Sequence, residues 1–154
     1  MNKILYLFLV IPIVFSSCSK EEVSGCTDPQ AANYDSNADI SDNSCLYNIN
    51  GVWGVDDYIL NGVSLFSTSL DIHITSMAIT LNNNGTTWTL AYYSDDSELN
   101  VYGTWSLAGT SQLILTNDEG DSTSWTITQL NGSTCELYSS DVGGMGEGTI
   151  RLSR

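Results

Sequence analysis

The chain has 154 residues, which is enough for one ordinary domain and a short appendage but leaves no room for a second large core. It contains 18 Asp and Glu against four Lys and Arg, and no Lys or Arg occurs between Glu21 and Ile150. Because such a surface repels phosphate backbones, the charge excludes nucleic acid as a partner and favours contact with cations.

Residues 1–17 have the pattern of a signal peptide rather than of a folded element. Lys3 supplies a positive start, residues 4–15 form an apolar run, and small residues then lead to Cys18. The run is too short to cross a bilayer. An ordinary secretory signal peptide would have the same features. However, the stretch "FSSC" resembles the lipobox of bacterial lipoproteins, which implies a lipid anchor on Cys18.

Residues 18–24 form a predicted tether between this anchor and the first folded segment. Within it, the stretch "SKEE" at residues 19–22 resembles the export signal of Bacteroidota lipoproteins, in which a Lys and two acids follow the lipidated Cys. The resemblance implies a protein that is anchored in the bacterial outer membrane and faces the cell surface.

Residues 25–47 contain Cys26 and Cys45 without a C-x-x-C pair, and the single His of the chain, His73, lies elsewhere. A secreted chain oxidises such cysteines, and a segment this polar could not order itself without a covalent link. We therefore predict a Cys26–Cys45 disulfide, worth about 3 kcal/mol in the chain-entropy model. Cys135 is left unpaired and is predicted to be a small buried hydrophobe.

The stretch "GCTDPQAANYDSNADISDNSC" is similar to a module of secreted Bacteroidota proteins that is likened to calcium-binding thrombospondin type 3 repeats. It departs from that module at Ser41, where Asp is usual, and at Asn43, where Gly is usual. Its carboxylate and amide oxygens are suitable calcium ligands. The first candidates for a calcium site are Asp35, Asn37, Asp39 and Asp42. Alternatively, these side chains cap turns by bonding backbone amides, which requires no metal.

Residues 51–154 alternate apolar and polar side chains in short runs separated by Gly, Asn and Asp clusters, without helical periodicity. This pattern predicts an all-β domain of about eight or nine strands in meander order, arranged as a small barrel or a sandwich. The predicted strands are residues 51–60, 69–76, 76–82, 86–93, 99–107, 112–117, 122–130, 131–140 and 146–154.

Strand parity predicts which side chains face the interior. Four tryptophans, Trp53, Trp88, Trp105 and Trp125, fall on positions predicted to point inward and to supply much of the core. Gly103 lies in the same row as Trp105, which predicts a bend or the close approach of a neighbouring strand.

The "G-x-W" of Gly51 and Trp53, the later "YGTWSL", the pair "TITQLNGSTCEL" and the terminal Arg look like the short lipocalin-like domains of Bacteroidota lipoproteins. The resemblance implies an antiparallel up-and-down barrel of about eight strands over residues 51–154. In lipocalins this Trp closes one barrel end beneath an Arg from the far end of the chain. By parity Arg154 shares the inward face of Ile150, so it is the candidate cation–π partner of Trp53.

The same resemblance implies that the barrel binds a small apolar or amphipathic ligand. The candidate ligand-binding residues are Trp88, Tyr92, Trp105 and Trp125. The alternative is a non-catalytic structural or protein-interaction module of the cell envelope, with the tryptophans filling the interior. An enzyme is not expected, because His73 has outward parity and the adjacent acids Asp56 and Asp57 should point to opposite faces of a strand.

Overall fold

The computed structural model describes residues 21–154, which contain strands, turns and loops but no helix. The predicted signal peptide, residues 1–17, and the predicted lipidation site Cys18 lie outside the described residues. No helix within residues 21–154 is long and apolar enough to cross a membrane.

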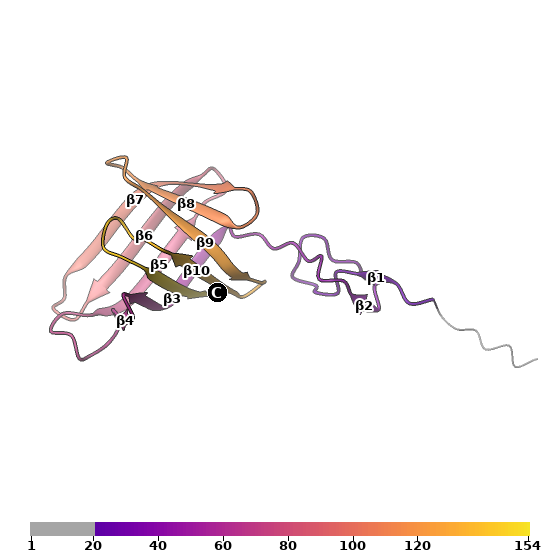
Figure 1. Ribbon diagram of the computed structural model, residues 1–154, viewed down its shortest axis with the longest axis horizontal. Helices are drawn as coiled ribbons and strands as arrows, with labels where there is room; N and C mark the ends of the chain where they lie inside the picture. Colours follow the sequence, from indigo (N-terminus) through magenta and orange to yellow (C-terminus); the bar gives the residue numbers. More distant parts are fainter. Residues whose placement is uncertain (1–20) are drawn as a thin grey trace, which may run out of the picture.

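Eight strands build the barrel, and each is antiparallel to the next along the chain (Figure 1). They are β3 (Gly51–Leu60), β5 (Ile74–Leu81), β6 (Thr86–Tyr93), β7 (Glu98–Ala108), β8 (Gln112–Asn117), β9 (Ser122–Leu130), β10 (Thr134–Ser139) and β11 (Gly148–Ser153). A two-residue strand, β4 (Val63–Ser64), pairs with the end of β3 outside this ring.

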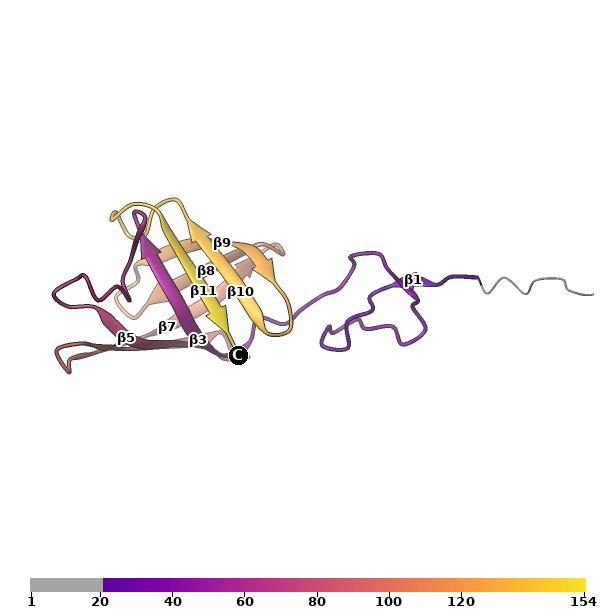
Figure 2. The same cartoon turned by 90° about the horizontal axis from the view of Figure 1, so that it is seen from below.

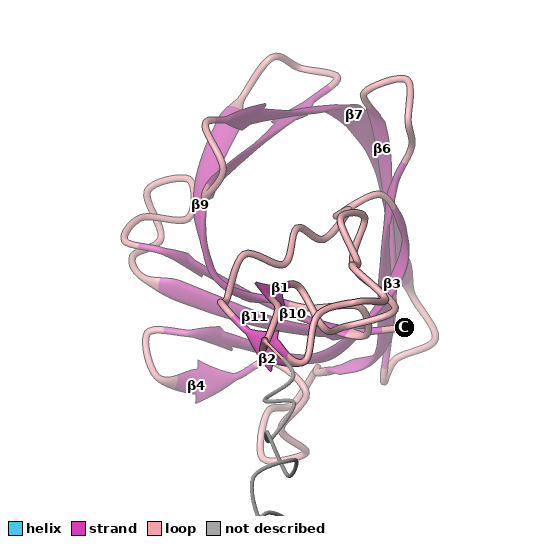
Figure 3. Cartoon of the chain, turned by 90° about the vertical axis from the view of Figure 1, so that its right-hand side faces the viewer, coloured by secondary structure: helices cyan, strands magenta, loops and turns pink. Residues whose placement is uncertain are grey.

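The barrel is closed because the last strand returns to the first. β11 pairs with β3 from Gly148, opposite Leu60, to Ser153, opposite Gly54. The two strands run side by side in Figure 2, and the strands form a ring in the view along the barrel in Figure 3. The predicted up-and-down barrel is thus confirmed and the sandwich alternative is wrong, since pairing of β11 with β3 leaves no free sheet edge between them.

The meander places the connections at two ends of the barrel. The end that we call the base contains the tight connections 82–85, 109–111 and 131–133, together with Arg154. The end that we call the mouth contains the connections 65–73, 94–97, 118–121 and 140–147. Residues 82–85, one of the Asn and Gly clusters between predicted strands, form a turn with Gly85 at a φ of 81°.

The hydrophobic core is concentrated around Trp53, whose side chain is fully buried. It includes the fully buried Leu81, Leu113, Leu137 and Leu152 from other strands, and Cys135 lies among them as predicted. Burial of each such large side chain contributes about 1.5–3 kcal/mol. Gly103 confirms the predicted close approach of a neighbouring strand, because a Cβ there would collide with the backbone oxygen of Thr116 on β8.

Two bulges change the strand parity that was read from the sequence. Residues 69–76 and 76–82 form one strand rather than two, because β5 begins only at Ile74 and its register shifts between Ile74 and Ser76. Ile72, which falls within the predicted strand 69–76, therefore lies in the preceding connection and is exposed. A bulge allows such a shift because two residues on one strand oppose one on the partner.

The second bulge lies on β3, where Arg151 pairs with Asp57 and the next residue, Leu152, pairs with Val55. Asp56 and Asp57 consequently both contact outward-facing residues of β11, and the prediction that they point to opposite faces is wrong. Asp56 accepts a hydrogen bond from Ser153 Oγ at 2.8 Å, and Asp57 forms a salt bridge with Arg151 at 3.6 Å.

Residues 25–47 fold as a separate loop module beside the base of the barrel (Figure 1). The predicted Cys26–Cys45 disulfide is present. The two-residue strands β1 (Ser24–Gly25) and β2 (Ile40–Ser41) pair in parallel. Asn33 spans the module, donating from Nδ2 to Ser44 O at 2.8 Å and accepting from Leu46 N at 2.7 Å.

Candidate functional site

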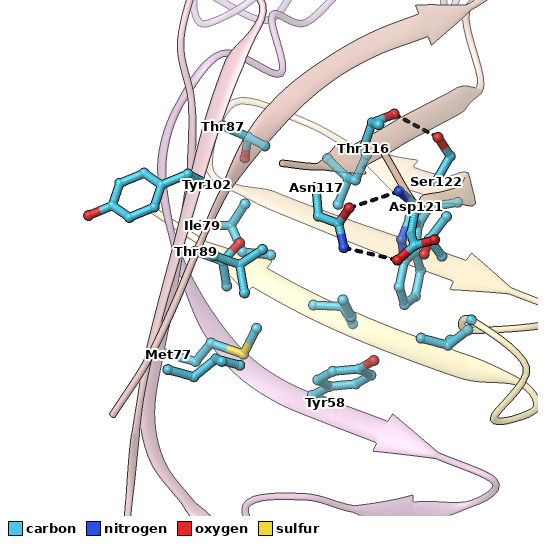
Figure 4. Close-up of a pocket in the computed structure, with 18 of the residues that line it drawn as sticks. Tyr58, Met77, Ile79, Thr87, Thr89, Tyr102, Thr116, Asn117, Asp121 and Ser122 are labelled. Atoms are coloured by element: carbon cyan, nitrogen blue, oxygen red, sulfur yellow. Dashed lines mark hydrogen bonds between the residues drawn. The ribbon is translucent and has the colours of Figure 1, made fainter. Parts of the chain in front are cut away.

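The interior of the barrel toward the mouth is a cavity of about 670 Å³. The walls are mostly apolar in their deeper part and polar toward the β8–β9 turn (Figure 4). Residues that line it include Met77, Ile79, Leu115, Trp125 and Ile150 as apolar groups and Thr87, Thr89, Asn117, Asp121 and Ser122 as polar groups. A volume of this size is typical of sites for small molecules.

The cavity exists because β6 turns small side chains inward. Thr87 and Thr89 line the cavity, whereas Trp88, between them, is exposed on the outer surface. There Trp88 stacks on Tyr102 of β7, with ring centroids 6.1 Å apart, and donates from Nε1 to Asn100. The prediction that Trp88 faces the interior and binds ligand is therefore wrong. The register of β6 turns Thr87 and Thr89 toward the interior and Trp88 away from it.

Tyr92 was also predicted to bind ligand, but it does not line the cavity. It lies on the same outer face of β6 as Trp88 and is 44% exposed. Trp105 packs against the core but donates from Nε1 to Asn82 O at the base, and it does not line the cavity. Trp125 is the predicted ligand-binding residue that the structure places in the cavity wall, where it is almost fully buried.

Tyr58 is a cavity residue that strand parity did not predict. The bulge at Asp56 and Asp57 turns its side chain inward, where its ring packs edge-on against Trp125 with centroids 6.2 Å apart. Burial, and secondarily the charge of Tyr93, raises the pKa of the Tyr58 hydroxyl. The hydroxyl therefore remains protonated at neutral pH and is available as a donor. No sequence signal marks this position, because the bulge depends on pairing with β11.

Thr87 provides a polar atom in the deeper wall. Its side chain is 8% exposed, and its Oγ1 has no hydrogen-bond partner among the described residues. A buried hydroxyl without a partner costs about 1–3 kcal/mol relative to a bonded one. A ligand that carries a hydrogen-bonding group would recover part of that free energy.

The base of the barrel is closed by Trp53 and Arg154. The guanidinium carbon of Arg154 lies 4.1 Å from the centroid of the Trp53 ring, as the lipocalin resemblance and the parity of the last strand together predicted. Arg154 also donates to the backbone oxygens of Asn48, Asn50 and Gly132 at 3.0, 2.7 and 3.0 Å. Through these contacts Arg154 links the end of β11 and the segment before β3 to the β9–β10 turn.

Two of the candidate calcium ligands of the loop module, Asp35 and Asp42, cap turns in the structure. Asp35 Oδ1 accepts from the backbone N of Asn37 at 2.9 Å, and Asp42 Oδ1 accepts from the backbone N of Ser44 at 2.9 Å. Asn43, where the related module has Gly, adopts a φ of 61°. Within residues 21–154, no three or more His, Cys, Asp or Glu side chains are grouped to hold a metal ion. Calcium binding at Asp35, Asn37, Asp39 and Asp42 stays a prediction.

His73 lies in the connection just before β5 rather than in a strand. It is half-buried, and its Nδ1 is buried without a hydrogen-bond partner among the described residues. It does not line the cavity.

A family model for the lipocalin-like domain matches residues 49–137, more than half of the chain. The chain belongs to the lipocalin-like family. The match includes the strands from β3 to most of β10, which carry most of the cavity wall. Lipocalin barrels commonly hold one small hydrophobic ligand in their interior.

Three solved structures resemble this lipocalin-like chain at low sequence identity. A lipocalin-like protein from Bacteroides uniformis is 15% identical, with a TM-score of 0.48 over 68% of this chain and 96% of that one. An uncharacterized protein from Bacteroides eggerthii is 10% identical, with a TM-score of 0.49 over 70% and 100%. A designed fluorescence-activating β-barrel is 9% identical, with a TM-score of 0.48 over 68% and 92%. No curated protein matches the chain significantly.

Proposed function

We propose that this lipocalin-like protein binds a small apolar or amphipathic molecule in the barrel cavity and does not catalyse a reaction. The observation that carries the proposal is the cavity of about 670 Å³ between Trp125, Met77 and the threonines of β6. Had all four tryptophans pointed inward, the interior of so small a barrel would have been filled. The outward position of Trp88 leaves that space free.

The polar atoms of the cavity favour an amphipathic ligand over a pure hydrocarbon. Thr87 Oγ1 is buried without a partner among the described residues, and the hydroxyl of Tyr58, another residue that lines the cavity, stays protonated at neutral pH. The ligand is thus expected to carry at least one hydroxyl, carbonyl or similar group on an apolar body.

A fluorescence titration with N-phenylnaphthylamine, a neutral apolar probe, tests ligand binding by the full chain. The probe should become brighter on addition of the protein, and Thr89→Phe should abolish the increase because the larger ring occupies the cavity. Leu90→Phe is the matched control, since Leu90 lies on the other face of the same strand. Equal probe binding by the two variants would contradict a site inside the barrel.

The anchoring of the protein rests on the sequence alone. We propose that Cys18 is lipidated and that the protein is held in the bacterial outer membrane, facing the cell surface. Mass spectrometry of the protein from its own membranes should show a diacyl or triacyl modification at Cys18. An unmodified N-terminus after cleavage would instead indicate simple secretion.

The alternative function, an interaction module of the cell envelope, is favoured by the outer face of β6 and β7. Trp88 and Tyr102 form an exposed aromatic pair there. Native mass spectrometry separates the two functions: a small-molecule adduct, or its uptake from a lipid extract, supports ligand binding. An apo mass without uptake favours the interaction module.

Calcium binding by the loop module is a separate hypothesis. Titration of calcium chloride into the full chain, after treatment with a chelator, should release heat and raise the protease resistance of residues 25–47 if Asp35, Asn37, Asp39 and Asp42 bind the ion.

A further inference from the structure

The charges of the barrel are distributed unequally between its two ends. The four mouth connections contain eight acids and no Lys or Arg, and all eight acids are exposed: Asp71, Asp95, Asp96, Asp118, Glu119, Asp121, Asp141 and Glu147. The base connections 82–85, 109–111 and 131–133 contain no acid, and Arg154 lies beside them. The remaining described cation, Arg151, pairs with Asp57 and Glu136 on the outside of the barrel wall.

The acidic mouth is also the entrance to the cavity. Asp121, in the β8–β9 turn, lines the cavity, and so do Gly143 and Met145 of the β10–β11 connection. The backbone N of Asp121 donates to Asn117 Oδ1 at 2.8 Å, which fixes the turn at the cavity edge (Figure 4). No Lys or Arg is among the cavity-lining residues.

Two of the mouth carboxylates accept hydrogen bonds from nearby backbone and hydroxyl donors. Asp141 Oδ1 accepts from the backbone N of Gly144 at 2.9 Å and of Gly146 at 3.3 Å. Asp95 accepts from the Oγ and the backbone N of Ser97, and these bonds hold the pKa of the Asp95 carboxyl below its usual value. A ring of negative charge around a low-dielectric opening raises the local concentration of cations and lowers that of anions.

The cavity behind this ring offers a ligand an unpartnered polar group in its deeper wall. Thr87 is more than nine-tenths buried in its wall, with an Oγ1 that lacks a partner among the described residues. In addition, Tyr58 and Trp125 place two aromatic rings in the wall, and aromatic rings attract cations, quaternary ammonium groups included.

We propose that the barrel selects amphiphiles that carry a positively charged nitrogen and rejects those that end in a carboxylate. The apolar body of such a ligand lies among Met77, Ile79 and Leu115, and its ammonium group lies toward the mouth, on the side of Asp121. This inference rests on the proposed ligand-binding function and specifies, in addition, the charge of the ligand.

The test compares three ligands built on ten-carbon chains, decyltrimethylammonium, decanol and decanoate, as competitors of N-phenylnaphthylamine on the full chain. The measurement is made below micellar concentrations, near neutral pH and at low salt. Decyltrimethylammonium should displace the probe at a concentration about ten-fold lower than decanoate, which corresponds to about 1.4 kcal/mol. Added salt should reduce this preference, because exposed charges are screened beyond about 10 Å at 0.1 M ionic strength.

Two double variants, each of which removes two negative charges, test whether the preference for ammonium depends on the acids of the mouth. Asp118→Asn with Asp121→Asn removes two charges at the mouth and should lower the ammonium preference at least about three-fold while decanol binding is unchanged. Glu21→Gln with Glu22→Gln removes two charges from the tether and should leave the preference as in the unmodified chain. Equal displacement by decanoate and decyltrimethylammonium, or an equal effect of both double variants, would overturn the inference. If the probe itself does not bind, the proposed function fails and the inference with it.

Discussion

Arg154, the last residue of the chain, covers the ring of Trp53 on the first barrel strand, with 4.1 Å between the guanidinium carbon and the ring centroid. The same guanidinium donates to three backbone oxygens around the base. One side chain thus closes the end of the barrel opposite the cavity and links β11 to the segment that leads into β3.

Replacement of Arg154 by Ala should therefore lower the free energy of unfolding by about 2–3 kcal/mol, since a cation–π contact and hydrogen bonds from a charged donor are lost together. Urea denaturation followed by tryptophan fluorescence measures the loss. Arg154→Lys should recover only part of it, because an ammonium group lacks the planar fork of donors. Arg151→Ala is the control and should cost less than about 1 kcal/mol, as exposed ion pairs do. A comparable loss for Arg151→Ala would contradict a special role for Arg154.

Thr87→Val should leave the stability of the barrel unchanged or raise it by about 1 kcal/mol. Valine has nearly the shape of threonine and removes a buried hydroxyl that has no partner among the described residues. The same denaturation experiment checks this, with Thr89→Val as the matched change on the same face of β6. In displacement titrations, Thr87→Val should weaken the binding of decanol more than the binding of N-phenylnaphthylamine. A loss of stability specific to Thr87→Val would show that the hydroxyl is bonded in solution.

Cys135 should be unreactive in the native protein. Burial raises the pKa of its thiol to about 11, although the nearby Arg154 acts in the opposite direction. Because the thiolate is the reactive form, iodoacetamide should modify Cys135 only after denaturation. Mass spectrometry of native and unfolded samples measures the modification. Rapid labelling of the folded chain near neutral pH would contradict the buried position.

The raised pKa of Cys135 also predicts a pH dependence of stability. Its folded-state pKa lies above the unfolded value, so the thiol contributes stability in full below the unfolded pKa, and that contribution is lost as pH rises through the folded pKa of about 11. The stability of the unmodified chain relative to Cys135→Ala should therefore fall between about pH 9 and pH 11. If the difference in free energy of unfolding between the unmodified chain and Cys135→Ala stayed constant across this range, the raised pKa of Cys135 would be ruled out.

Removal of the disulfide should affect the loop module far more than the barrel. Cys26→Ser with Cys45→Ser removes the covalent closure of the module, worth about 3 kcal/mol in the chain-entropy model. Limited proteolysis should then cut within residues 25–47, whereas the unfolding transition of the barrel should persist because the β11–β3 pairing closes it independently. Loss of the barrel transition would show that the module supports the barrel.

The sequence alone determined the all-β class, the meander, the disulfide between Cys26 and Cys45, and the parity that brings Arg154 to Trp53. The first three follow from local patterns: alternation with a period of two, turn residues between strands, or a polar segment that needs a covalent link. The pairing of Arg154 with Trp53 also required the resemblance to lipocalin-like domains, and parity only selected Arg154 over Arg151. The sequence likewise shows that many of the acids lie in four of the segments between strands. Only the fold, however, shows that those four connections lie at the same end of the barrel as the cavity.

The tertiary structure decided which face of each strand lines the cavity. A period of two gives two alternating rows but does not say which row points inward, and a single bulge exchanges them. The bulge at Asp56 and Asp57 turned Tyr58 inward, and the register of β6 placed Trp88 outside and Thr87 inside. These choices depend on pairing between strands that are distant in sequence and on how much volume the closed barrel can fill, so no local pattern could reveal them.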